Sequence, residues 1–288
     1  MHWCKPIVAR IALAALTVVL GGLLSATLAR YAPGFDSDER QLDARLSRES
    51  LDAIRQERAG ERAVASYYVG ALRRMARGDL GVSRTLQRPV RELLAQRAGV
   101  TLRLVAAGLA AAWAAALAWM LARGLSQSPG LHLAGALLSG ALLCLPVGAV
   151  ALLLVVLNGP AFLAIALAVF PKVDHYLRNL AFTASQMPHV VAAKAQGAVP
   201  ARVLLWHIVP VIRRELLALV GVSVAIAVGA AIPVEALCGL PGIGQLAWQA
   251  ALGRDLPVLI SVSVLVIACT VLANSGADLL SDARSTSA

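Results

Sequence analysis

The chain has 288 residues, of which 59% are apolar and only 15% are charged, and its mean hydropathy is +0.74. Because a soluble domain normally carries about 25% charged residues, this composition excludes an ordinary soluble fold and predicts an all-α polytopic membrane protein. The formal net charge of +10 indicates contact with anionic lipid and orientation signals. The basic residues form no aromatic-interleaved stripe or zinc-finger spacing, so nucleic acid is not an expected partner.

Six apolar stretches are long enough to cross a bilayer, which takes about 20 mostly apolar residues per helix. They cover residues 11–28, 104–122, 133–157, a segment that begins at 161, 216–234 and 256–273. We expect Pro146 to kink the third. The fourth is predicted to continue as one helix through "PKVDHYLRNL", because Asp174 and Arg178, like Lys172 and Tyr176, are spaced i,i+4 and satisfy each other.

The first span follows Lys5 and Arg10, an arrangement that a signal peptide shares, although "SATLARY" is a poor cleavage site. Short loops on the N-terminal side of the membrane are basic, whereas the short loops on the opposite side carry only Arg254. The positive-inside rule therefore predicts that both termini are cytoplasmic. Four arginines between residues 84 and 97, close to the second span, are the exception.

The long segment 31–99 lies between the first two spans and mixes acidic with basic residues. Apolar residues from Leu42 to Ile54 predict short amphipathic helices, and Pro89 suits the first turn of the helix "PVRELLAQRAG". The segment is either a solvated external cap or a surface for a partner.

The stretch "AAKAQGAVPARVLLWHIVP", residues 192–210, interrupts the apolar spans with basic residues, glycine and proline. Pro188 suits the first turn of a helix and Gly197 its end, so the residues between them predict about two helical turns. Pro200 then begins a second helix that leads into the fifth span. Three alanines let another surface approach the short helix closely, which makes it either a docking element for a groove on a partner or an interfacial connector.

Two charged residues of the fourth span are candidates for a solute path. A charge at the centre of a lipid-facing helix costs about 2.5–3.5 kcal/mol, so Lys172 and Asp174 are not expected to face lipid deep in the bilayer. They either line a cavity or lie near the cytoplasmic end of the span, where the side chains reach water.

A second candidate is the segment that follows the fifth span. Glu235 stands at the outer end of that span, and Gly242 and Gly244 permit tight turns around Pro241. The segment is either an external gate near the mouth of a pore or a hairpin in which Glu235 caps a helix.

Several stretches together resemble one family. "VAAKAQG" resembles the EAA loop of ABC-importer permeases, with Ala193 and Gly197 at the characteristic spacing and Val191 in place of its Glu or Arg. "YAPG", "RGDLGVS" and "RPVRELLAQR" resemble the two ends of that family's first external loop, and "VEALCGLPGIGQL" and "RDLPV" resemble its segment after the fifth span. The chain is identified as a member of the B-type permeases of dipeptide, oligopeptide and nickel ABC importers.

The resemblance implies a type I permease fold in the inner membrane and a division into three parts. These are residues 1–30 with the first span, an external region 31–99, and a permease core 100–288 that contains a coupling loop at 188–210 and a gate-like segment at 235–255. The ATPase-coupling residues are then Ala192, Ala193, Lys194, Gly197 and Arg202, and the path or gate residues are Lys172, Asp174, Glu235, Pro241, Gly242 and Gly244.

The same resemblance implies the partners: a second homologous permease, two cytoplasmic ATPases and an external substrate-binding protein that largely selects the solute. Family members move peptides, nickel complexes, glutathione or oligosaccharides. The sequence has no G-x-x-x-x-G-K-[ST] phosphate loop, so ATP hydrolysis is expected in separate chains and this chain is expected not to be an enzyme.

Two other classes of function compete with this interpretation. A secondary transporter or channel explains the spans and the intramembrane charges, but not the EAA-like loop, and no clear internal repeat supports it. An intramembrane enzyme needs a nucleophile–base or metal constellation. The four cysteines are scattered, no H-E-x-x-H occurs, and no catalytic residue, metal or cofactor is expected.

Overall fold

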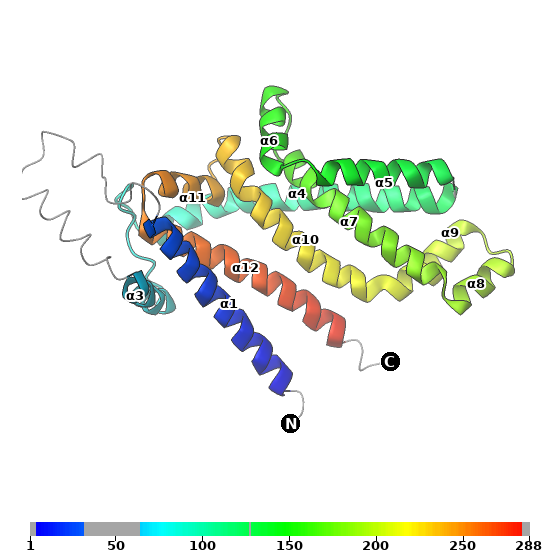
Figure 1. Ribbon diagram of the computed structural model, residues 1–288, viewed down its shortest axis with the longest axis horizontal. Coiled ribbons are helices and arrows are strands. Elements are labelled where there is room, and N and C mark those ends of the chain that lie inside the picture. Colours follow the sequence, from blue (N-terminus) through cyan, green and yellow to red (C-terminus); the bar gives the residue numbers. More distant parts are fainter. Residues whose placement is uncertain (1–3, 32–63, 127, 284–288) are drawn as a thin grey trace, which may run out of the picture. The chain divides into compact units, whose positions relative to one another are not determined.

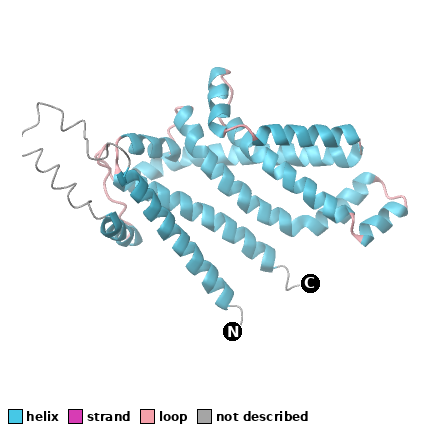
Figure 2. Cartoon of the chain, in the orientation of Figure 1, coloured by secondary structure: helices cyan, strands magenta, loops and turns pink. Residues whose placement is uncertain are grey.

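The computed structural model describes residues 4–31, 64–126 and 128–283, and every regular element in these ranges is helical (Figures 1 and 2). The elements are α1 (Cys4–Tyr31), α3 (Val64–Ala76), α4 (Val90–Ser126), α5 (Pro129–Leu143), α6 (Val147–Val156), α7 (Phe162–Ser185), α8 (Pro188–Ala195), α9 (Pro200–Arg202), the π-helical turn η2 (Val203–Ile208), α10 (Val209–Leu237), α11 (Ile243–Leu252) and α12 (Leu256–Ala283). The amphipathic helices expected between Leu42 and Ile54 lie outside the described residues.

The chain forms two compact units, and some helices contribute to both. The smaller unit contains Met1–Ala98 and Leu246–Ala268, and the larger contains Gly99–Gln245 and Cys269–Ala288. The boundaries fall inside α4, α11 and α12, and each unit is described separately below.

The larger unit is built around a stripe of apolar side chains on α7. Ile165, Val169, Val173 and Leu177 recur every four residues and are fully buried, as expected for the inward face of a helix. They pack with buried residues of α4 and α10. Gly108 of α4 allows this close approach, because a Cβ atom there would lie 2.7 Å from the Cβ of Ile165, and small residues permit such contacts between membrane helices.

The apolar stretch expected as one span at 133–157 is broken into α5 and α6. Their axes differ by 94° across the residues between Leu143 and Val147. Pro146 precedes α6 and lacks the N–H group that a continuous helix would need at that position. The expected effect of Pro146 is thus confirmed, but the single kinked helix is wrong.

Three described helical stretches are long and apolar enough to cross a membrane, or four if the bent α5–α6 pair is one span. They are Val90–Ser126, Pro200–Leu237 and Leu256–Gly276. These bear out the all-α polytopic class. The expected spans at 11–28 and from 161 fall in α1 and α7, which are not among these stretches; α1 contributes the shorter apolar helix Ala15–Ser25. In α7 the reason is the charged second half, which carries Lys172, Asp174 and Arg178.

The smaller unit depends on a buried carboxylate. Asp255, which is 1% exposed, accepts hydrogen bonds from the Ser83 hydroxyl at 2.6 Å, the Thr85 N–H at 3.0 Å and the Val258 N–H at 3.4 Å. The carboxylate therefore caps the start of α12 and fixes the loop before α4. Two stretches that carry the family resemblance, "RGDLGVS" and "RDLPV", meet at this side chain.

We predict that Asp255→Ala destabilises the chain, because the buried Ser83 hydroxyl and the Thr85 N–H lose their acceptor. Leaving buried donors unsatisfied costs about 1–3 kcal/mol, which thermal unfolding of the purified chain in detergent will detect. The matched control is Glu92→Ala, which removes an exposed pair with Arg88 and should change little. Equal unfolding temperatures for the two variants would contradict the capping role.

Candidate functional site

The short helix α8 begins and ends where the sequence predicts. Met187 is extended (ψ 142°), Pro188 takes the first helical position, and Gly197 adopts a φ of +80° after the last turn. The N–H of Ala198 donates to the Ala193 carbonyl at 3.1 Å and the N–H of Gly197 to the Lys194 carbonyl at 3.0 Å. This pair of bonds is a Schellman motif, so both ends of the helix are rigidly defined.

Helix α8 has an inner and an outer face. Val190 (fully buried) and Ala193 (8% exposed) face the interior, and Val190 belongs to the apolar core of the larger unit. Ala192, Lys194 and Gly197, together with Ala195, are exposed. Four of the five expected coupling residues, including exposed Arg202, therefore lie on the surface. Ala193 instead lies on the inner face and is a packing residue of the described chain.

The chain returns from α8 to the membrane through an unusual turn. Val199 is extended and Pro200 starts α9, as expected, but the helix then widens into the π-turn Val203–Ile208 before α10. Pro210 follows this turn and has no N–H to donate to the carbonyl of Trp206, four residues earlier. The wider turn accommodates that missing bond, and both α7 and α8 pack against it.

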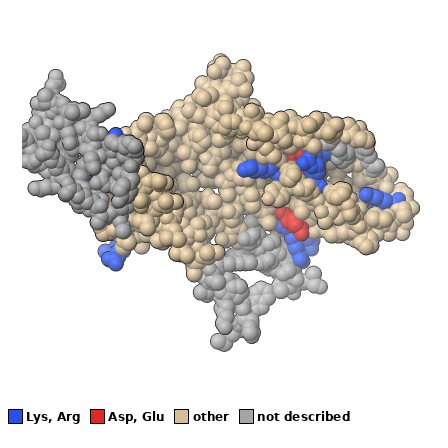
Figure 3. Space-filling model, viewed as in Figure 1, with Lys and Arg blue, Asp and Glu red and all other residues tan. Residues whose placement is uncertain are grey.

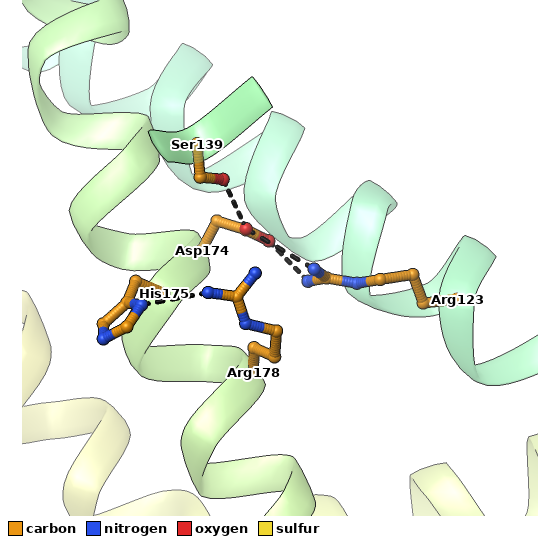
Figure 4. A network of polar contacts seen from close by, with 5 residues as sticks. All are labelled: Arg123, Ser139, Asp174, His175 and Arg178. Atoms are coloured by element: carbon orange, nitrogen blue, oxygen red, sulfur yellow. Dashed lines mark hydrogen bonds and ion pairs between the residues drawn. The ribbon is translucent and has the colours of Figure 1, made fainter. Parts of the chain in front are cut away.

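A buried ion pair links α4, α5 and α7 in the larger unit (Figure 4). Asp174 is fully buried; it pairs with Arg123 (4% exposed) and accepts a hydrogen bond from the Ser139 hydroxyl at 2.6 Å. The prediction that Asp174 pairs with Arg178 within α7 is wrong, since the carboxylate turns toward the neighbouring helices. A buried charge needs such partners, because isolation in a low-dielectric interior is prohibitively costly.

Arg178 lies one turn further along α7, beside this pair. Its Nη2 is 3.0 Å from the His175 Nδ1 atom, and its buried Nη1 has no hydrogen-bond partner in the described part of the chain. In Figure 4 the unbonded end of the guanidinium points toward Asp174 and Arg123. Lys172 and Tyr176, the other predicted pair, are both exposed.

A cavity of about 620 Å³ lies in the larger unit between the end of α4, the second half of α7 and the segment from Lys194 to Ile208. Arg123, Arg178 and Lys194 line it together with apolar side chains. Charged groups are otherwise sparse on the described face in Figure 3. The cavity is therefore bordered both by Arg123 of the buried ion pair and by the loop that contains α8.

The segment after α10 is organised by Glu235. This side chain is fully buried near the end of α10, and its Oε2 accepts a hydrogen bond from the Gly244 N–H at 2.6 Å, in the first turn of α11. A Cβ atom on Gly242 would collide with the Glu235 carboxylate, and one on Gly244 would lie 2.5 Å from the Ile232 Cα. Both glycines are thus required by close approach, and Glu235 caps a helix, as one of the two sequence interpretations expected. Pro241, which directly precedes Gly242, is exposed.

Cysteine and histidine chemistry gives no competing site. Partial burial raises the pKa of the Cys238 thiol, which favours its protonated form. Cys144, Cys238 and Cys269 are free thiols, and the described residues contain no cluster of three potential metal ligands.

Comparison with known proteins places these features in one family. Residues 114–285 match the family of inner membrane components of binding-protein-dependent transport systems. The chain belongs to this family. The matched region contains α8, the Arg123–Asp174 pair and the Glu235 segment.

Similar proteins extend the likeness beyond the family match. A protein of Brucella suis biovar 1 named as a peptide permease is 27% identical, over 92% of this chain and 94% of its own length. Its counterpart in Brucella ovis is 28% identical over the same shares. A Sinorhizobium fredii protein named as a peptide ABC transporter permease is 34% identical over 30% of this chain and 28% of its own length.

Family membership makes the chain a transport permease subunit of the inner membrane rather than an enzyme. The sequence interpretation missed Arg123 and Ser139, neither of which it named as a site residue. The unusual burial of an aspartate signals that partners exist. Their identity depends on contacts across 51 and 35 residues, which local spacing does not reveal.

We predict that the Arg123–Asp174 pair behaves as a unit. Arg123→Met or Asp174→Leu alone leaves a buried charge without its partner and should cost about 3–5 kcal/mol. The double variant removes both charges and should lose much less than the sum. Thermal unfolding in detergent measures all three variants, with Arg103→Met on the exposed side of α4 as the control. Additive losses in the double variant would show that the two side chains do not stabilise each other.

Proposed function

We propose that this chain forms the translocation path of an ATP-driven importer of peptides or related small solutes, and that α8 receives the movement of the ATPases. The observation that carries the proposal is the construction of α8. It has defined ends, an inner face in the core and an exposed outer face, and it lies within the family match. The names of the Brucella relatives support peptides as the solute class.

The proposed assembly contains a second homologous permease, two cytoplasmic ATPases and an external binding protein. Ala192 and Ala195 present a surface of small side chains that suits insertion into a groove, with Lys194, Gly197 and Arg202 at its margin. Ala193 contributes from the inner face by letting α8 lie close to the core.

We further propose six spans, with α1, α7 and the bent α5–α6 pair added to the three that length and composition support. The charges of α7 do not exclude a membrane position, because Asp174 is neutralised by Arg123 and faces protein rather than lipid. In this arrangement both termini and the coupling loop 188–210 are cytoplasmic, whereas 31–99 and the segment 235–255 are external. Residues 1–30 then form the first span with its cytoplasmic tail, and 100–288 form the permease core.

The solute path is proposed to involve two sets of residues in the larger unit. Lys172 is exposed on α7, two residues before the buried Asp174, and is available to a solute. At the external end, Glu235 and Gly244 hold the first turn of α11, with Gly242 and Pro241 in the connecting turn. Breaking the 2.6 Å bond between Glu235 and Gly244 would release that turn, which makes it the proposed gate.

The deciding experiment is purification of the tagged chain from its native membrane in mild detergent, followed by mass spectrometry and reconstitution. We expect two P-loop ATPases and a second permease to co-purify, and peptide uptake into proteoliposomes to require ATP. Recovery of the chain alone, with uptake that proceeds without ATP, would instead establish a secondary transporter or channel.

We predict that Ala192→Trp prevents ATPase association without unfolding the chain. The side chain is exposed on the outer face of α8, so a large ring there blocks a close-fitting groove but disturbs no core contact. Co-purification of the ATPases and ATP-dependent uptake should both be lost, while the unfolding temperature is unchanged. Ala76→Trp, at the exposed end of α3, is the control and should retain the ATPases. Normal ATPase recovery with Ala192→Trp would remove α8 as the docking element.

A further inference from the structure

The cavity between α4, α7 and the segment 194–208 has a marked excess of positive charge. Arg123, Arg178 and Lys194 line it, and its described lining includes no acidic residue. The nearby Asp174 neutralises Arg123, which leaves the charges of Arg178 and Lys194 without a carboxylate partner among the described residues. Two uncompensated cations at one cavity favour an anionic ligand.

Arg178 is the arginine of this cavity that has no carboxylate partner among the described residues. Its Nη1 atom is buried and points toward Asp174 and Arg123 (Figure 4), so the guanidinium meets a ligand through its charge and its other N–H groups. Arginine also matches the oxygen geometry of phosphate groups better than lysine does. Arg178 lines the cavity, so its positive charge acts directly on a phosphate bound there.

Apart from Asn179 and Ser185, the remaining walls of the cavity are apolar. Met120, Leu204 and Ile208 contribute to them, and so does Phe182, whose side chain is 65% exposed. A freely soluble anion gains nothing from such walls, whereas an acyl chain removes them from water. The chemistry of the lining therefore combines a site for a phosphate with a site for hydrocarbon.

The cavity lies at the ends of two candidate spans. Arg123 is in the last turn of α4, and Pro200, which also lines the cavity, begins the span Pro200–Leu237. Lipid phosphates lie at the level where membrane helices end, and basic pockets between such ends bind anionic headgroups. The position of the cavity and the chemistry of its lining therefore both fit the phosphate and acyl chain of a lipid.

We propose that this cavity binds an anionic phospholipid, with its phosphate on Arg178 and Lys194 and an acyl chain along Phe182 and Leu204. The lipid contacts both α7 and the segment that follows α8, so it fastens the coupling loop to the ends of the spans. This inference concerns lipid binding by the chain itself and holds whatever solute is transported.

The test is native mass spectrometry of the purified full-length chain, equilibrated in neutral detergent with phosphatidylglycerol or phosphatidylcholine. Phosphatidylglycerol should bind preferentially, and Arg178→Gln or Lys194→Gln should each weaken it about fivefold. Arg103→Gln, an exposed arginine of α4 outside the cavity, should bind like the unmodified chain. Arg178→Lys should retain most of the binding, because it keeps the charge.

Three outcomes would overturn the proposal. Equal retention of the two lipids would show that the cavity does not select an anion. Identical binding by Arg178→Gln, Lys194→Gln and Arg103→Gln would show that the lipid lies elsewhere. Displacement of phosphatidylglycerol by millimolar inorganic phosphate would assign the site to a soluble anion. Lys194 is exposed, so its variant keeps the test valid if an Arg178 variant fails to fold.

Discussion

The buried carboxylate of Asp174 fixes the relation of three helices in the larger unit. A charge removed from water is tolerated only with partners in good geometry, and here Arg123 of α4 and Ser139 of α5 supply them. Hydrophobic burial by itself leaves the apolar stripe of α7 free to take more than one register, because it is non-directional. The ion pair and hydroxyl bond remove that freedom and set the register on which the cavity and the loop after α7 depend.

This register extends to the short helix α8. Its inner face lies in the same core as α7, and the π-turn η2 packs against both helices. A force applied to the outer face of α8 therefore acts on the packed core of the larger unit and not on a flexible loop. Protein interiors are packed as densely as organic crystals. Under the proposed function, this is why an ATPase can move the spans through so small an element.

Local signals predicted the parts of the fold whose causes are local. Pro188 and Gly197 determine the ends of α8 through the first-turn and left-handed positions that these residues favour. The partners of Asp174 were not predictable in this way, because the i,i+4 rule describes an isolated helix, whereas tertiary contacts with Arg123 prevailed. Asp255 was likewise missed as an organising residue, since its main partners lie about 170 residues earlier in the chain.

The continuous helical stretch Pro200–Leu237 connects the two candidate functional regions of the larger unit. Its 38 residues extend about 55 Å at 1.5 Å per residue, from the π-turn beside α8 to Glu235, which holds the first turn of α11. A π-turn is the weakest part of such a helix, because its hydrogen bonds follow a rarer spacing often found at functional sites. A rotation of the chain at η2 would therefore either distort the π-turn itself or be transmitted along the α-helical part of this stretch to Glu235. Such a rotation would be resisted by the buried 2.6 Å hydrogen bond from the Gly244 N–H to Glu235. Ile232 also lies so close to Gly244 that the first turn of α11 cannot shift along α10 unless this hydrogen bond breaks.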